Sequence, residues 1–345
     1  MSSQTLDPVD SYPYKGIVTS PLWAEAQQWN FTDGEYGIIY HLATLSGDRQ
    51  LSHNVIAVTC PDGSVYAAKV VGPAVGERFG TDFCYSETKD PYREWEIGFH
   101  GGMRLISEEE KETGLLRDGQ NFPVKIKLNV RAASPVWVPG PREGDSESLL
   151  RKTWKFHHEQ ALTATGTIEV AGKSVEFSAI GHRDHSRGER NSQKTIHGFW
   201  VNATFPSGLK FACFAGEQNP GGEFERAAVY EGDQILEARL DKWSKIVDTH
   251  AEPRAFELRL VLQNGKELNV NAKCTRGMNW SAVGTSEWAL GSNVEASNQY
   301  IYTQYFGEFE CNGEIGQGFV DRGARASLLN VPIFDDFGSI ARCNR

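Results

Sequence analysis

Strict alternation of apolar and polar residues is the feature that most limits the fold of this chain. In the stretch AFELRLVLQNGKELNVNAKC, apolar residues recur at every second position over 256–262 and again over 268–272. Successive side chains of a β-strand point to opposite faces, so this pattern predicts two strands. The Asn264-Gly265 pair between them predicts a tight hairpin turn.

The same period-2 pattern occurs along most of the chain. It flanks Asp62-Gly63 and continues through 125–132 and 166–181. Helical periodicity is confined to two short stretches, 107–119 and 145–154. Strands separated by turns, without alternating helices and without a fixed-period repeat, predict an all-β protein built from antiparallel barrels or sandwiches.

The length of 345 residues exceeds what one typical core accommodates and favours two β-units. The best candidate boundary is 134–148, where three prolines and two glycines separate two strand-rich regions. We therefore expect two domains, covering residues 1–142 and 143–345.

Charge and composition narrow the class of partner. The net charge of −10 argues against nucleic acid or an anionic membrane, because binding phosphate requires an excess of basic residues. The chain contains no apolar run long enough for a membrane-spanning helix, and its first residues do not resemble a signal peptide, so a cytoplasmic protein is expected. The six cysteines lack metal-site spacing and are expected to be buried thiols.

The stretch GHRDHSRGER, at residues 181–190, concentrates charged and titratable groups. The hairpin before it allows a two-residue type II′ turn with Gly172 at the first central position, which pairs Val170 with Val175. Extended along the strands, this register places Asp184 opposite Ala161.

In this register, four titratable side chains share one face of the strand pair, namely His157, Glu159, His182 and Asp184. The other face carries His158, Arg183 and His185. Neighbouring carboxylates and imidazoles at such separations shift each other's pKa, as a general acid or base requires. A single β-bulge would exchange the faces and bring Arg183 and His185 into the site instead.

Other interpretations of this stretch stay open. Asp184 and Glu189 could pair with Arg187 and Arg190 in a salt-bridged rim without chemistry. Two histidines and two carboxylates could also bind a metal ion, although their spacing matches no known signature, and we expect no metal. Ser186 lacks the G-x-S-x-G context of a catalytic serine.

Aromatic residues further along the chain predict an apolar lining. The strand pair over 197–216 and the strands over 300–323 are rich in aromatic side chains. Glycines at 313, 316 and 318 do not form a dinucleotide-binding loop before a helix, so no cofactor is expected. The candidate substrate-binding residues are His158, Phe199, Trp200, Phe214, Tyr302 and Tyr305.

The sequence GHRDHSRG, after a strand bearing His157 and Glu159 and before an aromatic GFW strand, resembles the AttH-like family. That family includes the carotenoid 1,2-hydratases (hydroxyneurosporene synthases) and is similar to the fungal lipocalin-like Diels-Alderases. The resemblance implies two tandem lipocalin-like antiparallel β-barrel domains with few short helices. It covers most of the chain in layout and residues 154–216 in motif.

The resemblance also implies residue roles. The family's acidic residue falls on Asp184, and in the hydratases this residue is thought to protonate an isolated alkene so that water can add. The preceding aromatic position falls on His182, where tyrosine is usual, and Ser186-Arg187 replaces the usual Asn-Trp. The strand before it aligns its histidine and aromatic positions within 156–158.

Two functions follow as hypotheses. The preferred one is an enzyme that binds a hydrophobic isoprenoid or polyketide-like molecule between the domains. Asp184 would act as general acid or base, assisted by His182, Glu159 and His157, in hydration, isomerisation or cyclisation of an alkene. An apolar pocket would keep the acid protonated by raising its pKa. The alternative is a non-catalytic lipocalin-like carrier of an apolar ligand.

Overall fold

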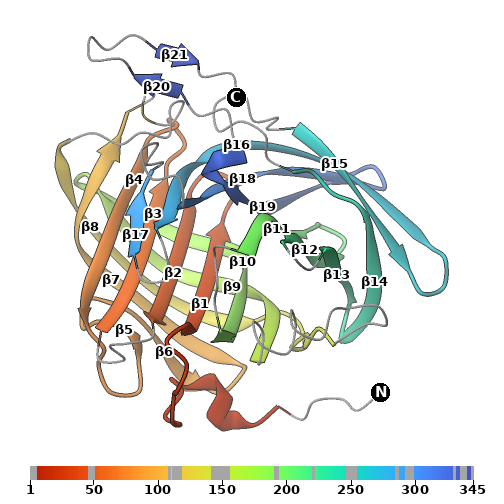
Figure 1. Cartoon of the computed structure of the whole chain (residues 1–345), viewed down its shortest axis with the longest axis horizontal. Coiled ribbons are helices and arrows are strands. Elements are labelled where there is room, and N and C mark those ends of the chain that lie inside the picture. The colour runs from red at the N-terminus through yellow and green to blue at the C-terminus, as the bar shows by residue number, and fades with distance from the viewer. Residues whose placement is uncertain are drawn as a thin grey trace.

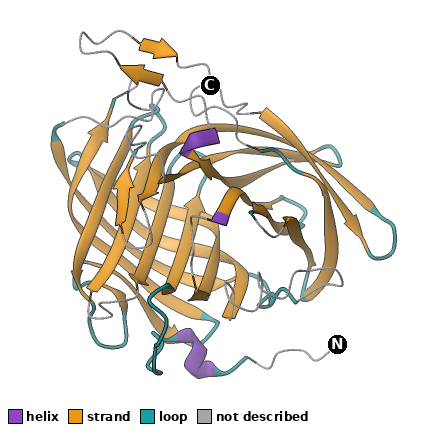
Figure 2. Cartoon of the chain, in the orientation of Figure 1, coloured by secondary structure: helices purple, strands orange, loops and turns teal. Residues whose placement is uncertain are grey.

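The computed structural model describes residues 6–45, 51–107, 110, 119–140, 156–189, 194–219, 222–245, 255–283, 287–291, 299–328, 332–334 and 340–342. Strands dominate these residues, and short 3₁₀ turns such as η1 (Pro8–Ser11) and η3 (Ala326–Leu328) accompany them (Figures 1 and 2). Of the two stretches expected to be helical, 145–154 lies outside the described residues and 107–119 lies almost wholly outside them.

Eight strands of the first sheet close into an antiparallel barrel. They follow the order β4-β3-β2-β1-β10-β9-β8-β7, and pairing of β4 with β7 closes the ring. The short strands β6 (Cys84–Asp90) and β5 (Phe79–Gly80) extend the sheet beyond β7. The barrel strands are β1 (Trp23–Thr32), β2 (Gly37–Leu45), β3 (Leu51–Thr59), β4 (Val65–Pro73), β7 (Glu94–Ile106), β8 (Asn121–Ala132), β9 (Phe156–Val170) and β10 (Lys173–Glu189).

A second barrel follows in the chain and lies beside the first (Figure 1). Its order is β15-β14-β13-β12-β11-β19-β18-β16, closed by pairing of β15 with β16, and β17 (Glu287–Leu290) pairs with the far end of β16. A separate two-stranded sheet joins β20 (Pro332–Phe334) to β21 (Ile340–Arg342). The barrel strands are β11 (Thr195–Thr204), β12 (Lys210–Gln218), β13 (Gly222–Glu231), β14 (Gln234–Lys242), β15 (Ala255–Leu262), β16 (Glu267–Val283), β18 (Gln299–Cys311) and β19 (Glu314–Arg325).

These two barrels confirm the predicted all-β fold. The hairpin around Asn264-Gly265 also forms as predicted, with Leu258 opposite Val270. The two sheets divide the chain at a different place from the one that the prolines suggest. Because β9 and β10 pair with β8 and β1, the first barrel ends at Glu189, and the expected boundary at 142/143 falls between two of its strands.

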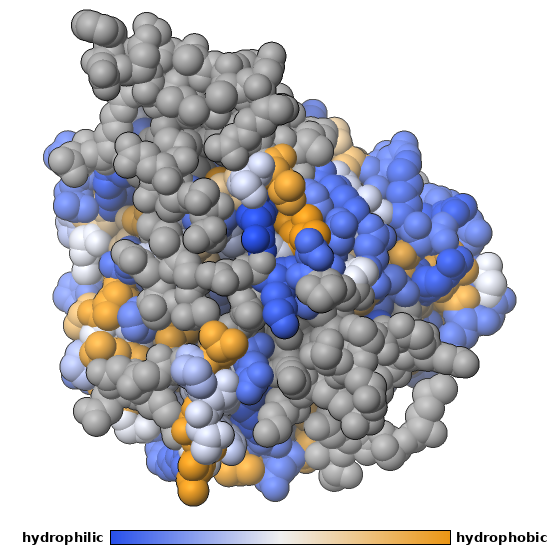
Figure 3. Space-filling model, viewed as in Figure 1, coloured by the Kyte–Doolittle hydropathy of each residue, from blue (hydrophilic) through white to orange (hydrophobic). Residues whose placement is uncertain are grey.

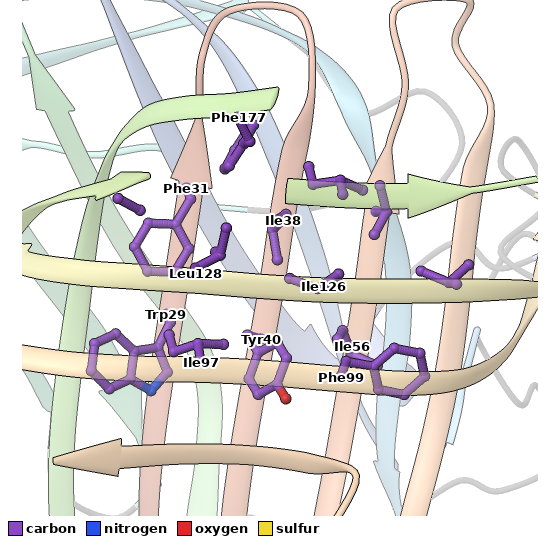
Figure 4. Packing of buried hydrophobic residues seen from close by; sticks show 14 of the residues in the cluster. Trp29, Phe31, Ile38, Tyr40, Ile56, Ile97, Phe99, Ile126, Leu128 and Phe177 are labelled. Atoms are coloured by element: carbon purple, nitrogen blue, oxygen red, sulfur yellow. The ribbon is translucent and has the colours of Figure 1, made fainter. Parts of the chain in front are cut away.

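Each barrel has its own core. Figure 4 shows part of the first, in which Trp29, Phe31 and Tyr40 pack against inward-facing residues of β7, β8 and β10. The second core gathers Phe199, Phe211 and further apolar side chains of β11–β16 and β18–β19. The prediction of buried thiols is confirmed for Cys60, Cys84, Cys213, Cys274 and Cys311, whereas Cys343 lies outside the described residues.

The outer faces of the two barrels pack on one another. One apolar cluster joins residues of β1–β4, such as Ile39, to Trp280 and Phe306 of the second barrel. The outer face of β14 and β15 instead carries ion pairs, among them Lys242 with Glu257, and Figure 3 shows hydrophilic residues over this side of the molecule. Near the open end of the β9–β10 hairpin, the outer-face side chains of His157, Glu159 and His182 are buried and so are held away from bulk water.

The β9–β10 hairpin fixes the geometry of these polar side chains. Its central turn residues are Ala171 and Gly172, and both have positive φ, 50° and 80°, which is the pattern of a type I′ turn. Val170 therefore pairs with Lys173 and not, as predicted, with Val175. The predicted type II′ turn is wrong, because the tight turn sits one residue earlier in the chain.

Replacing Ala171 with asparagine is expected to stabilise the protein by about 0.5–1 kcal/mol. Asparagine tolerates the left-handed backbone better than alanine, and Ala171 is exposed. The midpoint of urea unfolding measures the change. As a control, Gly172→Ala adds a Cβ that meets open space but must adopt positive φ, so it should destabilise. An unchanged midpoint in both variants would contradict the turn type.

Candidate active site

The register of β9 and β10 brings two carboxyls face to face. Asp184 lies opposite Glu159, and His182 lies opposite Ala161. This register differs by two residues from the prediction, which paired Asp184 with Ala161. A shift of two preserves the alternation of faces, so the face predicted for each of the four titratable side chains is also the face that the structure gives it.

Glu159 lies at the centre of this face, between two histidines. Its Oε1 accepts a hydrogen bond from His157 Nε2 at 3.0 Å, and its Oε2 accepts one from His182 Nε2 at 3.0 Å. Burial by itself raises the pKa of Glu159, but the hydrogen bonds from the two histidines outweigh it and lower the pKa to about 2. Glu159 is therefore an ionised carboxylate that holds two N–H donors, and not a proton donor. Glu159 and these two histidines are called the Glu159 group below.

Asp184 lies at the edge of the Glu159 group. Its Oδ2 is 3.8 Å from His157 Nδ1, and its Oδ1 accepts a hydrogen bond from the backbone N–H of Gln28 at 3.1 Å. The side chain is 20% exposed, whereas Glu159 is completely buried. Asp184 is thus the member of the cluster that a molecule arriving from outside could touch.

The opposite face of the strand pair lies inside the first barrel. Arg183 contacts His158 there and stacks on Trp95 and Trp29, with its guanidinium carbon 4.3 Å and 5.2 Å from the ring centres. Burial lowers the pKa of Arg183 to about 9 and lowers that of His158 well below its usual value. His158, a predicted substrate-binding residue, is therefore part of the barrel interior and not of the face with Asp184.

Within the described part of the chain, Arg187 does not form the predicted pair with Asp184. Arg187 lies on the same side of β10 as Arg183, where it pairs with Asp10 and lies 3.8 Å from Glu25. Because alternate residues face opposite sides, Arg187 and Asp184 point away from one another. Arg190, the other predicted partner, lies outside the described residues.

Aromatic side chains of the second barrel lie over the Glu159 group. The Trp200 ring centre is 5.8 Å from that of His182, and the Phe214 ring centre is 5.2 Å from that of His157. The Tyr230 ring is 6.4 Å from His182, and its buried hydroxyl has no hydrogen-bond partner among the described residues. Trp200 and Phe214 are thus brought to the predicted catalytic residues, as a substrate-binding role requires.

A second acidic residue approaches from the other barrel. Asp321 on β19 is buried, and its Oδ2 accepts hydrogen bonds from Gln304 Nε2 at 2.7 Å and from Gln28 Nε2 at 3.3 Å. Burial raises the pKa of Asp321 to about 7, and the nearby Asp184 charge adds to this rise against the two hydrogen bonds. Gln28 therefore contacts both aspartates, one through its backbone and one through its side chain.

Three other predicted substrate-binding residues lie elsewhere. Phe199 and Tyr305 face the core of the second barrel. Tyr302 lies between the barrels but stacks on Trp280, with ring centres 4.1 Å apart. None of the ring contacts described for these three residues involves the Glu159 group.

Sequence reasoning missed several residues that surround the site. Trp137 pairs through its backbone with Glu159, with both hydrogen bonds at 2.8 Å, and its ring contacts Phe214. For Asp321 a signal existed, because a single acidic residue interrupts an apolar strand in GFVDRG. For Gln28 and Gln304 no signal existed, since neutral amides are ordinary strand residues.

Two features of the described residues bear on the class of site. No group of three or more histidine, cysteine, aspartate or glutamate side chains in this part of the chain has an arrangement that could hold a metal ion. Among the same residues, no helix has the length and apolar character needed to cross a lipid bilayer.

Two closed antiparallel barrels in tandem, with a polar cluster between them, define a protein of the lipocalin-like fold. Within that class, the chain belongs to the family described as Domain of unknown function (DUF7064), which matches residues 7–322. No curated protein matches the sequence.

Solved structures support the same fold. An AttH-like protein of Nitrosomonas europaea is 12% identical with a TM-score of 0.54, over 88% of this chain and 92% of that one. CghA is 9% identical with a TM-score of 0.55, over 89% of each chain, and was also solved with Sch210972. Similarity to AttH-like proteins, predicted from residues 154–216, is thus confirmed for the fold.

Proposed function

We propose that this protein is an enzyme that acts on a hydrophobic isoprenoid or polyketide-like small molecule at a carbon–carbon double bond. The observation that carries the proposal is the position of Asp184, a partly exposed carboxyl at the edge of the buried Glu159 group and between two barrels. The structure of CghA with Sch210972 supports the proposal, because a protein of the same fold was solved there with a small molecule.

The surroundings of Asp184 suit acid–base chemistry at an alkene. Protonation of a double bond, or its polarisation, develops positive charge on carbon. The ionised carboxylate of Glu159 would supply negative potential to such a charge, and the nearby rings of Trp200 and Phe214 would surround it with aromatic surface. Hydration, double-bond isomerisation and cationic cyclisation pass through states that this environment would stabilise, whereas a pericyclic cyclisation would depend mainly on the shape and preorganisation of the site.

The substrate would lie between the barrels and not inside one. Large side chains, including Trp29, Phe31 and Tyr40, occupy the interior of the first barrel (Figure 4), and Phe199, Phe211 and Phe309 occupy the second. A carrier that holds its ligand within a barrel is therefore the less favoured function. At the contact between barrels, the hydroxyl of Tyr230, which has no hydrogen-bond partner in the described part of the chain, would be available to a polar group of a mostly apolar molecule.

Replacing Asp184 with asparagine tests the proposal. Wild-type protein is first screened against isoprenoid alkenes and enone-bearing polyketides, with tryptophan fluorescence as the measure of binding and mass spectrometry of products as the measure of turnover. We expect Asp184→Asn to reduce turnover at least about 100-fold, the usual effect of losing a general acid or base, with binding nearly unchanged.

The control is Asp233→Asn, a change of the same kind at an exposed turn position of the second barrel, which should leave turnover at the wild-type level. Equal turnover by Asp184→Asn and the wild type would exclude the catalytic role. Binding without turnover in the wild type would identify a carrier.

A further inference from the structure

Asp184 and Asp321 reach the same contact between the barrels from opposite sides. Gln28 of β1 joins them, since its backbone N–H donates to Asp184 Oδ1 and its side-chain amide donates to Asp321 Oδ2. Trp200 lies opposite Asp321 in the β11–β19 pair, and its ring contacts His182. Asp321 is therefore a neighbour of the Glu159 group, although it lies more than a hundred residues away in sequence.

The two aspartates differ in environment. Asp184 is partly exposed and receives a backbone N–H donor, which favours an ionised carboxylate. Asp321 is only 8% exposed, and no cation pairs with it among the described residues. Both amides donate to Oδ2 of Asp321, so the proton of its neutral form belongs on Oδ1.

We propose that Asp321 is the proton donor of the site and Asp184 its proton acceptor. This inference rests on the proposed function and assigns the direction in which the proton moves. Paired acid and base catalysis usually relies on two carboxyls, one kept protonated by its environment and the other kept ionised. The second barrel then contributes a reacting group and not only an apolar wall.

The proton balance is as follows. The O–H bond of Asp321 breaks, and its proton forms a C–H bond at one carbon of the substrate double bond. In isomerisation, Asp184 takes a proton from a carbon adjacent to the cation, whereas in hydration it takes one from the water that adds to the cation. Transfer of that proton from Asp184 back to Asp321 through water restores both groups.

The groups around Asp321 explain why it is the donor. The charged neighbour is the Asp184 carboxylate of β10, which raises the pKa of Asp321 further above the value set by burial. Tyr300 of β18 is a buried neutral phenol that also faces Asp321. Gln28 of β1, Gln304 of β18 and Trp200 of β11 carry no charge. The Glu159 group lies beside Asp184 on the same face of the β9–β10 pair.

Activity of the variants at controlled pH tests the assignment, using the isoprenoid or polyketide-like compound that the wild type converts. With the wild type, kcat/KM should fall as pH rises through about 7, where Asp321 loses its proton. Asp321→Asn should lower kcat at least about 100-fold with little change in KM, and should lose this alkaline limb. Asp233→Asn should behave as the wild type.

An infrared measurement that requires no substrate accompanies the kinetic experiments. Difference infrared spectra of wild type against Asp321→Asn should show the band of a protonated carboxylic acid below pH 7 that disappears above it. If Asp321→Asn does not fold, Gln304→Met serves in its place. Loss of that hydrogen bond should move the infrared titration and the alkaline limb to higher pH.

The outcomes separate the two proposals. Loss of turnover in Asp184→Asn but not in Asp321→Asn would overturn the present inference and leave the proposed function standing. Unchanged turnover in both variants would overturn the proposed function as well. An infrared spectrum in which Asp321 is already ionised below pH 6 would by itself exclude it as the donor.

Discussion

Replacing Glu159 with glutamine is expected to lower the free energy of unfolding at pH 7 by about 3 kcal/mol. The hydrogen bonds from His157 and His182 lower the pKa of Glu159 from 4.5 to about 2, and a shift of that size corresponds to roughly this free energy. A glutamine amide accepts through its oxygen only, so one of the two buried histidine N–H groups would lose its acceptor. Urea unfolding measures the loss.

The pH dependence identifies the cause. In the folded protein the pKa of Glu159 lies below its ordinary value. The contribution of Glu159 to the free energy of unfolding is therefore fully present above about pH 4.5 and is lost as pH falls towards about 2. The difference in the free energy of unfolding between wild type and Glu159→Gln should become smaller over that pH range. Glu169→Gln is the matched control on β9, since Glu169 is 51% exposed and its pair with Lys125 should contribute less than about 1 kcal/mol. A difference that stays constant with pH would rule out the charge as its source.

Replacing Trp280 with alanine is expected to lower the free energy of unfolding by about 3–5 kcal/mol, the range for removing a buried tryptophan. Trp280 is 1% exposed and lies between the barrels. It stacks on Tyr302 at 4.1 Å, and its edge meets His41 of the first barrel at 5.4 Å. Alanine would leave a cavity at the contact that holds the two halves of the candidate site together.

Denaturant unfolding and turnover should change together in this variant. A looser contact would displace Asp321 from Asp184, so activity should decline although the ring contacts described for Trp280 are with His41, Trp288 and Tyr302. Phe83→Ala is the control, because Phe83 is 47% exposed and its loss should change stability little. Wild-type stability in Trp280→Ala would show that the barrels do not depend on this cluster.

Local sequence patterns predicted the part of the candidate site that lies on the β9–β10 hairpin. Alternation placed His157, Glu159, His182 and Asp184 on one side of the hairpin, and the predicted register was wrong by two residues without changing that result. The error came from the turn, because Ala171 adopts positive φ where glycine is the usual residue. A one-residue error would have exchanged the faces.

Aromatic composition was a weaker guide. Trp200 and Phe214 lie over the Glu159 group, whereas Phe199 and Tyr305 lie in a barrel core, although all four occur in similar strands. Alternation shows which residues of a strand share a face of the sheet. Whether that face meets a barrel core or the other barrel depends on how the barrels pack. The sequence of a single strand does not contain that information when both sides are buried.

The sequence by itself determined the all-β class and the side of the β9–β10 hairpin on which each polar residue lies, because strand alternation is a local property of the backbone. The two tandem barrels were implied by the family resemblance and not by the alternation. Only the tertiary structure decided that this hairpin completes the first barrel, and that Gln28 and Asp321 meet Asp184 there. Those contacts depend on barrel closure and on packing between barrels, which join residues far apart in the chain. The local pattern marks Asp321 as an acidic residue in an apolar strand, but only the packing of the barrels places this proposed proton donor beside Asp184.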